Sequence, residues 1–261
     1  MTLSISKVYK TEAIILKRTK LGEADKILTL YTPYMGKYRA VAKGVRRPVS
    51  KLGGHVELLA RSQMMLARGQ NLDIITQSQT IENFLPLRED LGRVSHAFYV
   101  AELMDAFNAE RIENAPLYQL LLDTLRWLSE SQENDMACRF FELRLLDYVG
   151  YRPQLRECVG CRKPLDAVTN RFSISGGGIF CPECTQKAFQ GQAISPNALK
   201  VMRFLQQSDL DSAKRLRVSD ATASEMEVLT RGYIQYLLER KIRSADFLDT
   251  LRYERSVSIK V

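Results

Sequence analysis

Two Cys-x-x-Cys pairs separated by 19 residues constrain this chain more than any other feature of its sequence. Cys158 and Cys161 form the first pair, and Cys181 and Cys184 form the second. Each spacing lets one tight turn direct two sulfurs at a common ion, and four thiolates suit tetrahedral Zn²⁺. Because four thiolates leave no coordination position for water, the sequence predicts one structural zinc ion and not a catalytic one.

Residues 155–190 are expected to form a loop-rich insertion that this ion stabilises, with Gly176, Gly177 and Gly178 at its tip. The segment holds too few apolar residues to fold alone, and at such sites metal binding supplies folding free energy. Disulfide redox cycling by either pair is the alternative, but the sequence around the pairs lacks the strand-to-helix setting of thioredoxin-like motifs. The fifth cysteine, Cys138, lies in an apolar helical pattern and is expected to be buried.

The N-terminal part of the chain predicts five short β-strands, because apolar or alternating runs are separated there by turn residues. Five short strands in one small segment favour a closed sheet, and the OB-type barrel, which binds oligonucleotides on one face, is the commonest such fold. The predicted strands cover residues 13–17, 27–31, 37–45, 56–66 and 72–80.

The third predicted strand is unusually basic on one face. Alternation places Lys37, Arg39, Val41 and Lys43 on that face and turns Tyr38 toward the core. The strand continues into a loop, so that residues 37–51 contain no acid and six cations: Lys37, Arg39, Lys43, Arg46, Arg47 and Lys51. Guanidinium and ammonium groups on such a segment can follow a phosphate backbone. A solvated basic hairpin is the alternative interpretation.

The charge of the chain is concentrated in the same region. The formal net charge is +8, and residues 1–80 hold 14 basic and five acidic residues, whereas the remaining 181 residues hold 24 basic and 25 acidic ones. This asymmetry is typical of a module that faces a polyanion, although a merely soluble basic domain would show it too.

After Pro86 the apolar period changes to that of α-helices, which predicts an all-α domain. A helix is expected to open at Leu87, with the acidic pair Glu89 and Asp90 at its start, and a later one to begin at Ser195 and Pro196. The tail, residues 252–261, is expected to be frayed or strand-like. His55 and His96 show no metal or catalytic spacing and are expected in a loop or on a helix surface.

The sequence contains no phosphate-binding loop, nucleophile elbow or zinc-protease motif, so we expect a protein that is not an enzyme. No run approaches the roughly 20 apolar residues of a membrane helix, so we expect no membrane association and a cytoplasmic location. Scattered acids that could hold Mg²⁺ for nuclease chemistry leave a zinc-dependent nucleic-acid enzyme as a weaker alternative.

Two short segments occur in a fixed order with the basic strand and the cysteine pairs along the chain. They are Gly-Glu-Ala-Asp-Lys at residues 22–26 and Lys-Gly-Val-Arg-Arg-Pro at residues 43–48. Over nearly its whole length the chain resembles the RecO family of bacterial DNA repair and recombination mediators. The resemblance implies an α+β fold: a five-stranded OB-type barrel in residues 1–80, then a helical domain in residues 81–261 that contains the zinc-binding insertion.

The resemblance also implies a function that needs no catalysis. RecO proteins bind single- and double-stranded DNA, anneal complementary strands and, with RecR and sometimes RecF, help load RecA onto strands coated by single-stranded DNA-binding protein. We therefore expect association with the nucleoid. The family's pocket for the acidic tail of single-stranded DNA-binding protein lies in the helical domain.

The expected contacts follow from the same resemblance. DNA would be held by Lys37, Arg39, Lys43, Arg46, Arg47 and Lys51, and zinc by Cys158, Cys161, Cys181 and Cys184. Some members of the family lack these cysteines, so zinc is expected to shape the fold and not to carry the shared activity. A protein-interaction adaptor, whose basic domain docks acidic partners and binds DNA only incidentally, is the alternative function.

Overall fold

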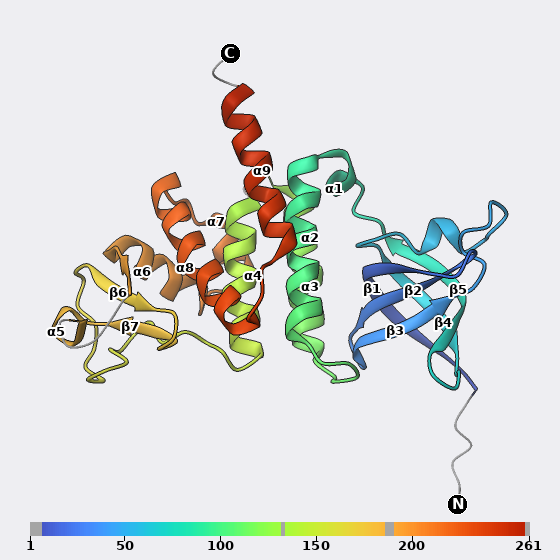
Figure 1. Ribbon diagram of the computed structural model, residues 1–261, viewed down its shortest axis with the longest axis horizontal. Coiled ribbons are helices and arrows are strands. Elements are labelled where there is room, and N and C mark those ends of the chain that lie inside the picture. Colours follow the sequence, from blue (N-terminus) through green and yellow to red (C-terminus); the bar gives the residue numbers. More distant parts are fainter. Residues whose placement is uncertain (1–6, 132–133, 186–190, 259–261) are drawn as a thin grey trace, which may run out of the picture. The chain divides into compact units, whose positions relative to one another are not determined.

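The computed structural model describes residues 7–131, 134–185 and 191–258 of the chain. These residues divide into two compact units, Met1–Glu130 and Ser131–Val261 (Figure 1). Residues 186–190 of the predicted insertion and residues 259–261 of the predicted tail lie outside the described residues.

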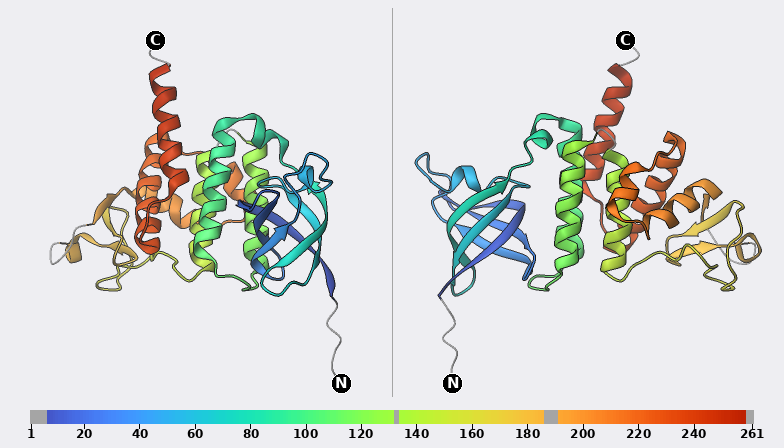
Figure 2. Two further views of the ribbon diagram at one scale, coloured as in Figure 1. Left: turned by 45° about the vertical axis from the view of Figure 1, so that its right-hand side comes forward. Right: turned by 180° about the vertical axis from the view of Figure 1, so that it is seen from behind.

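The first unit contains the five predicted strands, closed into a barrel in the order β1-β2-β3-β5-β4. Figure 2 shows the strands wrapping around one another. Four of the pairings are antiparallel, and a short parallel pairing of β3 with β5 completes the circle, as an OB-type barrel requires. The strands are β1 (Val8–Leu21), β2 (Asp25–Thr32), β3 (Gly36–Ala42), β4 (Arg61–Ala67) and β5 (Asp73–Glu82).

The core of the barrel follows from alternation along these strands. Leu28 and Leu30 of β2 and Tyr38 of β3 are buried in one apolar cluster, which confirms the inward orientation predicted for Tyr38. Its hydroxyl and that of Tyr9 both donate to the carboxylate of the buried Asp73. Asp73 lies on β5 and is paired with Ala40 of β3, so this polar cluster reinforces the barrel at its short parallel pairing.

The fourth predicted strand begins too early. Residues 56–60 are irregular and follow the short helix η1 (Gly53–His55), and β4 begins only at Arg61. Val56, Leu59 and Ala60 are nevertheless buried. The apolar run at residues 56–60 has the composition of a buried strand, which explains the wrong prediction. Its side chains instead pack into the core from an irregular backbone, in which Leu59 has a positive φ of 67°.

Three helices complete the first unit: α1 (Leu85–Glu89), α2 (Leu91–Phe107) and α3 (Ala115–Glu130). The single helix predicted from Leu87 is interrupted at Asp90, which is extended and accepts a hydrogen bond from the Arg93 backbone N–H at 2.8 Å. Asp90 thus caps a helix start, as predicted, but the helix is the second one, and Glu89 is the last residue of α1 and not at a helix start.

Polar contacts join α3 to the barrel within this unit. Arg61 of β4 makes two hydrogen bonds to the Glu12 carboxylate, at 2.7 and 3.0 Å, and the Tyr118 hydroxyl of α3 donates to the same carboxylate. Arg126 of α3 pairs with Glu82 of β5 at 2.9 Å. The strand-rich segment ends close to residue 80, but these contacts place the three following helices in the barrel's compact unit.

The second unit is helical and carries a small sheet. Three short strands, in the order β7-β6-β8, lie in the predicted insertion and directly after it. They were not predicted, because strands of three or four residues are too short to show an alternating pattern. The elements are α4 (Asn134–Tyr148), β6 (Asn170–Ser173), β7 (Gly178–Phe180), α5 (Pro182–Thr185), β8 (Gln192–Ile194), α6 (Pro196–Leu205), α7 (Leu210–Arg215), α8 (Asp220–Leu238) and α9 (Arg243–Ser258).

The predictions for individual residues of the helices have mixed outcomes. Ser195 caps α6 by accepting from the Ala198 N–H, and Cys138 is fully buried, both as predicted. His96 is buried on α2, with its Nδ1 2.7 Å from the Gly92 carbonyl oxygen, so its predicted surface position is wrong. Within the described residues no helix has the length and the apolar character needed to cross a membrane.

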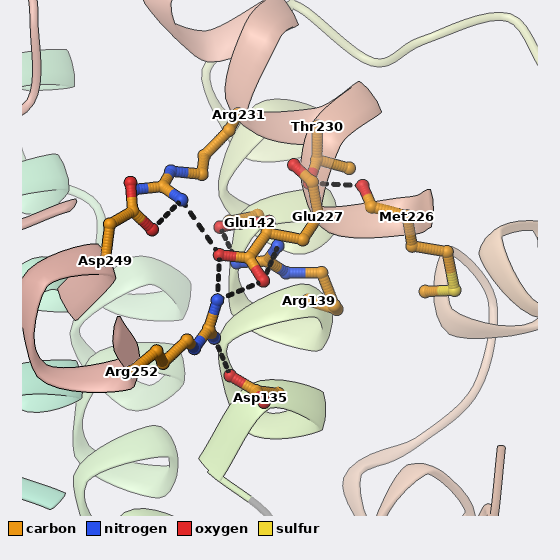
Figure 3. A network of polar contacts seen from close by, with 9 residues as sticks. All are labelled: Asp135, Arg139, Glu142, Met226, Glu227, Thr230, Arg231, Asp249 and Arg252. Carbon is orange, nitrogen blue, oxygen red and sulfur yellow. Dashed lines mark hydrogen bonds and ion pairs between the residues drawn. The ribbon is translucent and has the colours of Figure 1, made fainter. Parts of the chain in front are cut away.

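The described part of the predicted tail, residues 252–258, is helical and not frayed or strand-like. Arg252 of α9 makes ion pairs with Asp135 of α4 and with Glu227 of α8, at 2.7 Å in the latter case (Figure 3). Arg231 of α8 reaches Asp249 of α9 at 2.9 Å. These contacts between segments remote in sequence stabilise α9, and no periodicity within the tail could reveal them.

Candidate functional site

The four cysteines of the second unit form a candidate metal centre. Their Sγ atoms all lie within 4.8 Å of one another, and the Sγ atoms of Cys161 and Cys181 are 3.8 Å apart. Four sulfurs arranged tetrahedrally at about 2.3 Å from a zinc ion are separated by about 3.8 Å, so the cluster has the dimensions of a zinc site. The structure thus brings the predicted ligand set together.

Two tight turns position these sulfurs. Cys158 and Cys161 lie on one turn, closed by a hydrogen bond of 2.8 Å from the Arg162 N–H to the Cys158 carbonyl. Cys181 follows β7 directly and Cys184 lies in α5, where its N–H donates to the Cys181 carbonyl at 3.1 Å. Of the predicted glycine tip, Gly176 and Gly177 lie in the turn between β6 and β7 and Gly178 begins β7, so the small sheet positions the second pair.

The electrostatics of the cluster favour a cation. Burial opposes ionisation of Cys158, but backbone N–H groups, that of Cys181 first among them, lower the pKa of its thiol to about 6. Hydrogen bonding with Cys161, together with burial and the other sulfurs, raises the pKa of Cys184 to about 12. Four sulfurs this close can all be thiolates only when a positive ion compensates their mutual repulsion.

The six predicted DNA-binding cations divide into two groups in the first unit. Lys37 is engaged: its Nζ donates to the Asp105 carbonyl at 2.6 Å and pairs with the Asp105 carboxylate at 3.3 Å, and its side chain is only 14% exposed. Arg39 pairs with Glu110 at 2.5 Å. The side chain of Arg39 nevertheless stays 49% exposed. Acids of α2 and of the segment after it therefore pair with the two cations on this face of β3, and the strand ends at Ala42, so Lys43 lies beyond the predicted strand face.

The second group, Lys43, Arg46, Arg47 and Lys51, lies on residues 43–51, which we call the basic loop. All four side chains are exposed, and within the part of the chain that the structure describes none of them makes an ion pair. The loop is held to the barrel by its backbone, since the Gly44 N–H donates to the Asp25 carboxylate at 2.7 Å and the Arg46 N–H to the Ala24 carbonyl at 3.0 Å.

Two further cations, which the sequence reasoning missed, extend this basic end of the barrel. Lys20 of β1 is paired with Lys26 of β2, and Lys26 is paired with Ala42, the residue before Lys43. Lys20 near the end of β1, Lys26 near the start of β2 and Lys43 directly after β3 therefore lie at the same end of the barrel. The turn at Gly22, with its positive φ of 56°, could have revealed the pairing of the first two lysines, because a tight turn fixes the register of a hairpin.

Comparisons with known proteins agree with this architecture. The chain matches the family model described as Recombination protein O N terminal over residues 5–84, and that described as Recombination protein O C terminal over residues 88–246. It is 45% identical to a DNA repair protein RecO of Roseiflexus sp. (strain RS-1) over 94% of its length and 87% of the relative.

Further relatives have lower identity but also match along nearly the whole chain. A DNA repair protein RecO of Dehalococcoides mccartyi is 43% identical over 93% of this chain and 96% of its own. One of Symbiobacterium thermophilum is 36% identical over 95% and 99% respectively. With a closed N-terminal barrel, a helical unit that carries a four-cysteine cluster, and matches along nearly its whole length, the chain belongs to the RecO family of DNA repair proteins.

Proposed function

We propose that the protein is a non-enzymatic recombination mediator that binds single- and double-stranded DNA through the basic end of its barrel. It would anneal complementary strands and, with RecR and in some settings RecF, assist RecA loading onto strands coated by single-stranded DNA-binding protein. The observation that carries the proposal is the basic loop, whose four exposed cations make no ion pairs among the described residues. A phosphate backbone would supply the charge that they lack.

Replacing Arg46 and Arg47 together by glutamate is expected to weaken binding of a labelled single-stranded oligonucleotide by about 10- to 100-fold at moderate salt. The slope of log affinity against log salt should fall by about 1.4, because two phosphate contacts are lost at about 0.7 each. Fluorescence anisotropy at several salt concentrations measures both quantities, and strand annealing should slow in parallel.

The matched control replaces Arg240 and Lys241 by glutamate. These two cations are exposed and adjacent in the second unit, so the net charge changes equally while the basic loop stays intact. Loss of affinity in both double variants would mean that only the total charge matters. Wild-type affinity and slope in the Arg46 and Arg47 variant would show that the loop does not contact DNA.

We also propose that the cysteine centre holds one structural zinc ion. Purified protein should contain about one zinc per chain, and Cys181→Ser with Cys184→Ser should lose it, because two thiolates cannot complete the coordination. Cys138→Ala, which alters the buried cysteine remote from the cluster in sequence, should retain the metal. Metal content by mass spectrometry and hydrogen exchange of β6 and β7 provide the readouts, and full metal content in the double variant would refute the assignment.

A pocket in the second unit is a candidate site for the acidic tail of single-stranded DNA-binding protein. It has a volume of about 350 Å³, is lined by apolar Phe204 and Leu216, and carries the cations Lys200 and Arg217. Basic and apolar groups together suit an acidic peptide. Binding of a tail peptide to the Arg46 and Arg47 double variant would fit both the mediator and the adaptor function. If the wild-type protein bound the tail peptide but no DNA, the adaptor function would be favoured.

A further inference from the structure

Among the side chains that the structure describes, the most exposed large apolar one lies within the basic loop. Val49 is 89% exposed, and its neighbour Pro48 is also exposed. Arg46 and Arg47 precede this pair and Lys51 follows it. Contact with phosphates needs no apolar group, so electrostatic binding leaves an exposed proline and valine among these cations unexplained.

The loop presents this pair on a supported backbone. Before the pair, Val45 is buried in the barrel core, and after it Leu52 packs against the same core. Between these anchors two turns are closed by hydrogen bonds of 3.0 Å, from the Arg47 N–H to the Gly44 carbonyl and from the Ser50 N–H to the Arg47 carbonyl. The loop, drawn in light blue between β3 and η1, extends away from the strands (Figure 1).

We propose that Pro48 and Val49 act as an apolar wedge that packs on the exposed face of the terminal base pair at a junction between double- and single-stranded DNA. The surrounding cations would hold the phosphates on either side. The inference rests on the proposed DNA binding by the basic loop. It adds that the loop binds a particular DNA structure, the junction, in preference to others. Proteins that insert apolar wedges, proline among them, between base steps rely on the same contact between an apolar side chain and the face of a base pair.

A junction is the occupant that the side chains favour. Inside a continuous duplex the wedge would have to separate two stacked base pairs, and one proline and one valine bury too little apolar surface to offset that loss. On isolated single strands, proteins stack bases on aromatic rings, and the basic loop contains none. At a junction the last base pair already exposes a flat apolar face, and both a duplex backbone and a single-stranded backbone lie within reach of the cations.

The test compares three labelled DNAs of equal phosphate number: a duplex, a single strand, and a duplex with a single-stranded extension and 2-aminopurine beside the junction. The wild-type protein should bind the junction about fivefold more tightly than the duplex and change the 2-aminopurine fluorescence. Pro48→Ala with Val49→Ser should lose the preference and the fluorescence change, while its affinity for duplex and its salt slope stay unchanged. Val168→Ser, which alters an exposed valine of the second unit, is the matched control.

Each outcome bears on one claim. Equal wild-type affinity for junction and duplex, or an unchanged preference in the double variant, overturns the wedge and leaves the proposed DNA binding intact. The wedge is also overturned if the affinity of the double variant falls by the same factor for all three DNAs and its salt slope is reduced. That result would mean that the loop has lost its phosphate contacts. Absence of wild-type binding to every DNA would instead refute the proposed function on which the inference rests.

Discussion

Replacing Glu227 by glutamine is expected to lower the free energy of unfolding of the second unit by about 3–5 kcal/mol. Glu227 lies on α8 with a side chain that is only 12% exposed, and its carboxylate is the centre of the network in Figure 3. It contacts Arg252 of α9 at 2.7 Å, Arg231 at 3.0 Å and the nearly buried Arg139 of α4 at 4.0 Å. Glutamine keeps the shape but leaves these guanidinium groups with less compensating charge.

The matched control for this change is Asp249→Asn. Asp249 pairs with Arg231 in the same network, but its side chain is 55% exposed, so neutralising it should cost less than about 1 kcal/mol. Urea unfolding followed by circular dichroism measures the global loss, and hydrogen exchange along α9 locates it. If the two variants were equally stable, the buried carboxylate would not organise the network, and α9 would depend on apolar packing of Ala245 and Leu248 instead.

Gly36→Ala is expected to destabilise the first unit by about 3–5 kcal/mol, from a strained backbone and a forced displacement together. Gly36 begins β3 with a positive φ of 57°, and a Cβ built on it would lie 1.8 Å from the carbonyl oxygen of Ile112. To make room, the segment after α2 must move away from β3. That movement would break the hydrogen bond of 2.8 Å from the Arg111 N–H to the Lys37 carbonyl.

Gly22→Ala separates the two contributions to this loss. Gly22 has nearly the same φ, 56°, but a Cβ built there meets no described atom within 4 Å, so only the left-handed backbone is penalised, by about 1–2 kcal/mol. The fluorescence of Trp127, the chain's one tryptophan and a buried residue of α3 in this unit, reports the urea transition of both variants. If both variants lost the same free energy of unfolding, displacement of the segment after α2 would contribute nothing to the effect of Gly36→Ala.

Much of this architecture follows from local pattern. Alternation with turn residues predicted five strands, and the side chain of Tyr38 points into the core as its place in the alternation required. The spacing of the cysteines predicted a four-sulfur cluster, because a tight turn within each pair fixes the direction of two sulfurs whatever the rest of the fold. Helix starts at Ser195 and beside Asp90 were also visible, since capping depends on residues within one turn.

Other predictions failed where distant segments decide the outcome. Residues 56–60 have the apolar composition of a strand, but they fill the end of the barrel from an irregular backbone. The tail lacks any strong helical pattern, yet ion pairs to α4 and α8 support a helix through residue 258. Contacts of this kind join residues more than 20 positions apart, and no local periodicity encodes them.

The sequence by itself determined the four-cysteine cluster, the closed barrel and the concentration of positive charge in residues 37–51, because spacing, alternation and composition are properties of neighbouring residues. Only the tertiary structure decided which cations remain available. Folding brings the acids Asp105 and Glu110 to Lys37 and Arg39. The four cationic side chains of the basic loop pair with no acid among the described residues, and Lys20 and Lys26 lie at the same end of the barrel. The difference is physical: a cation's availability depends on the charges that folding places around it, and alternation along one strand carries no information about what will cover its face.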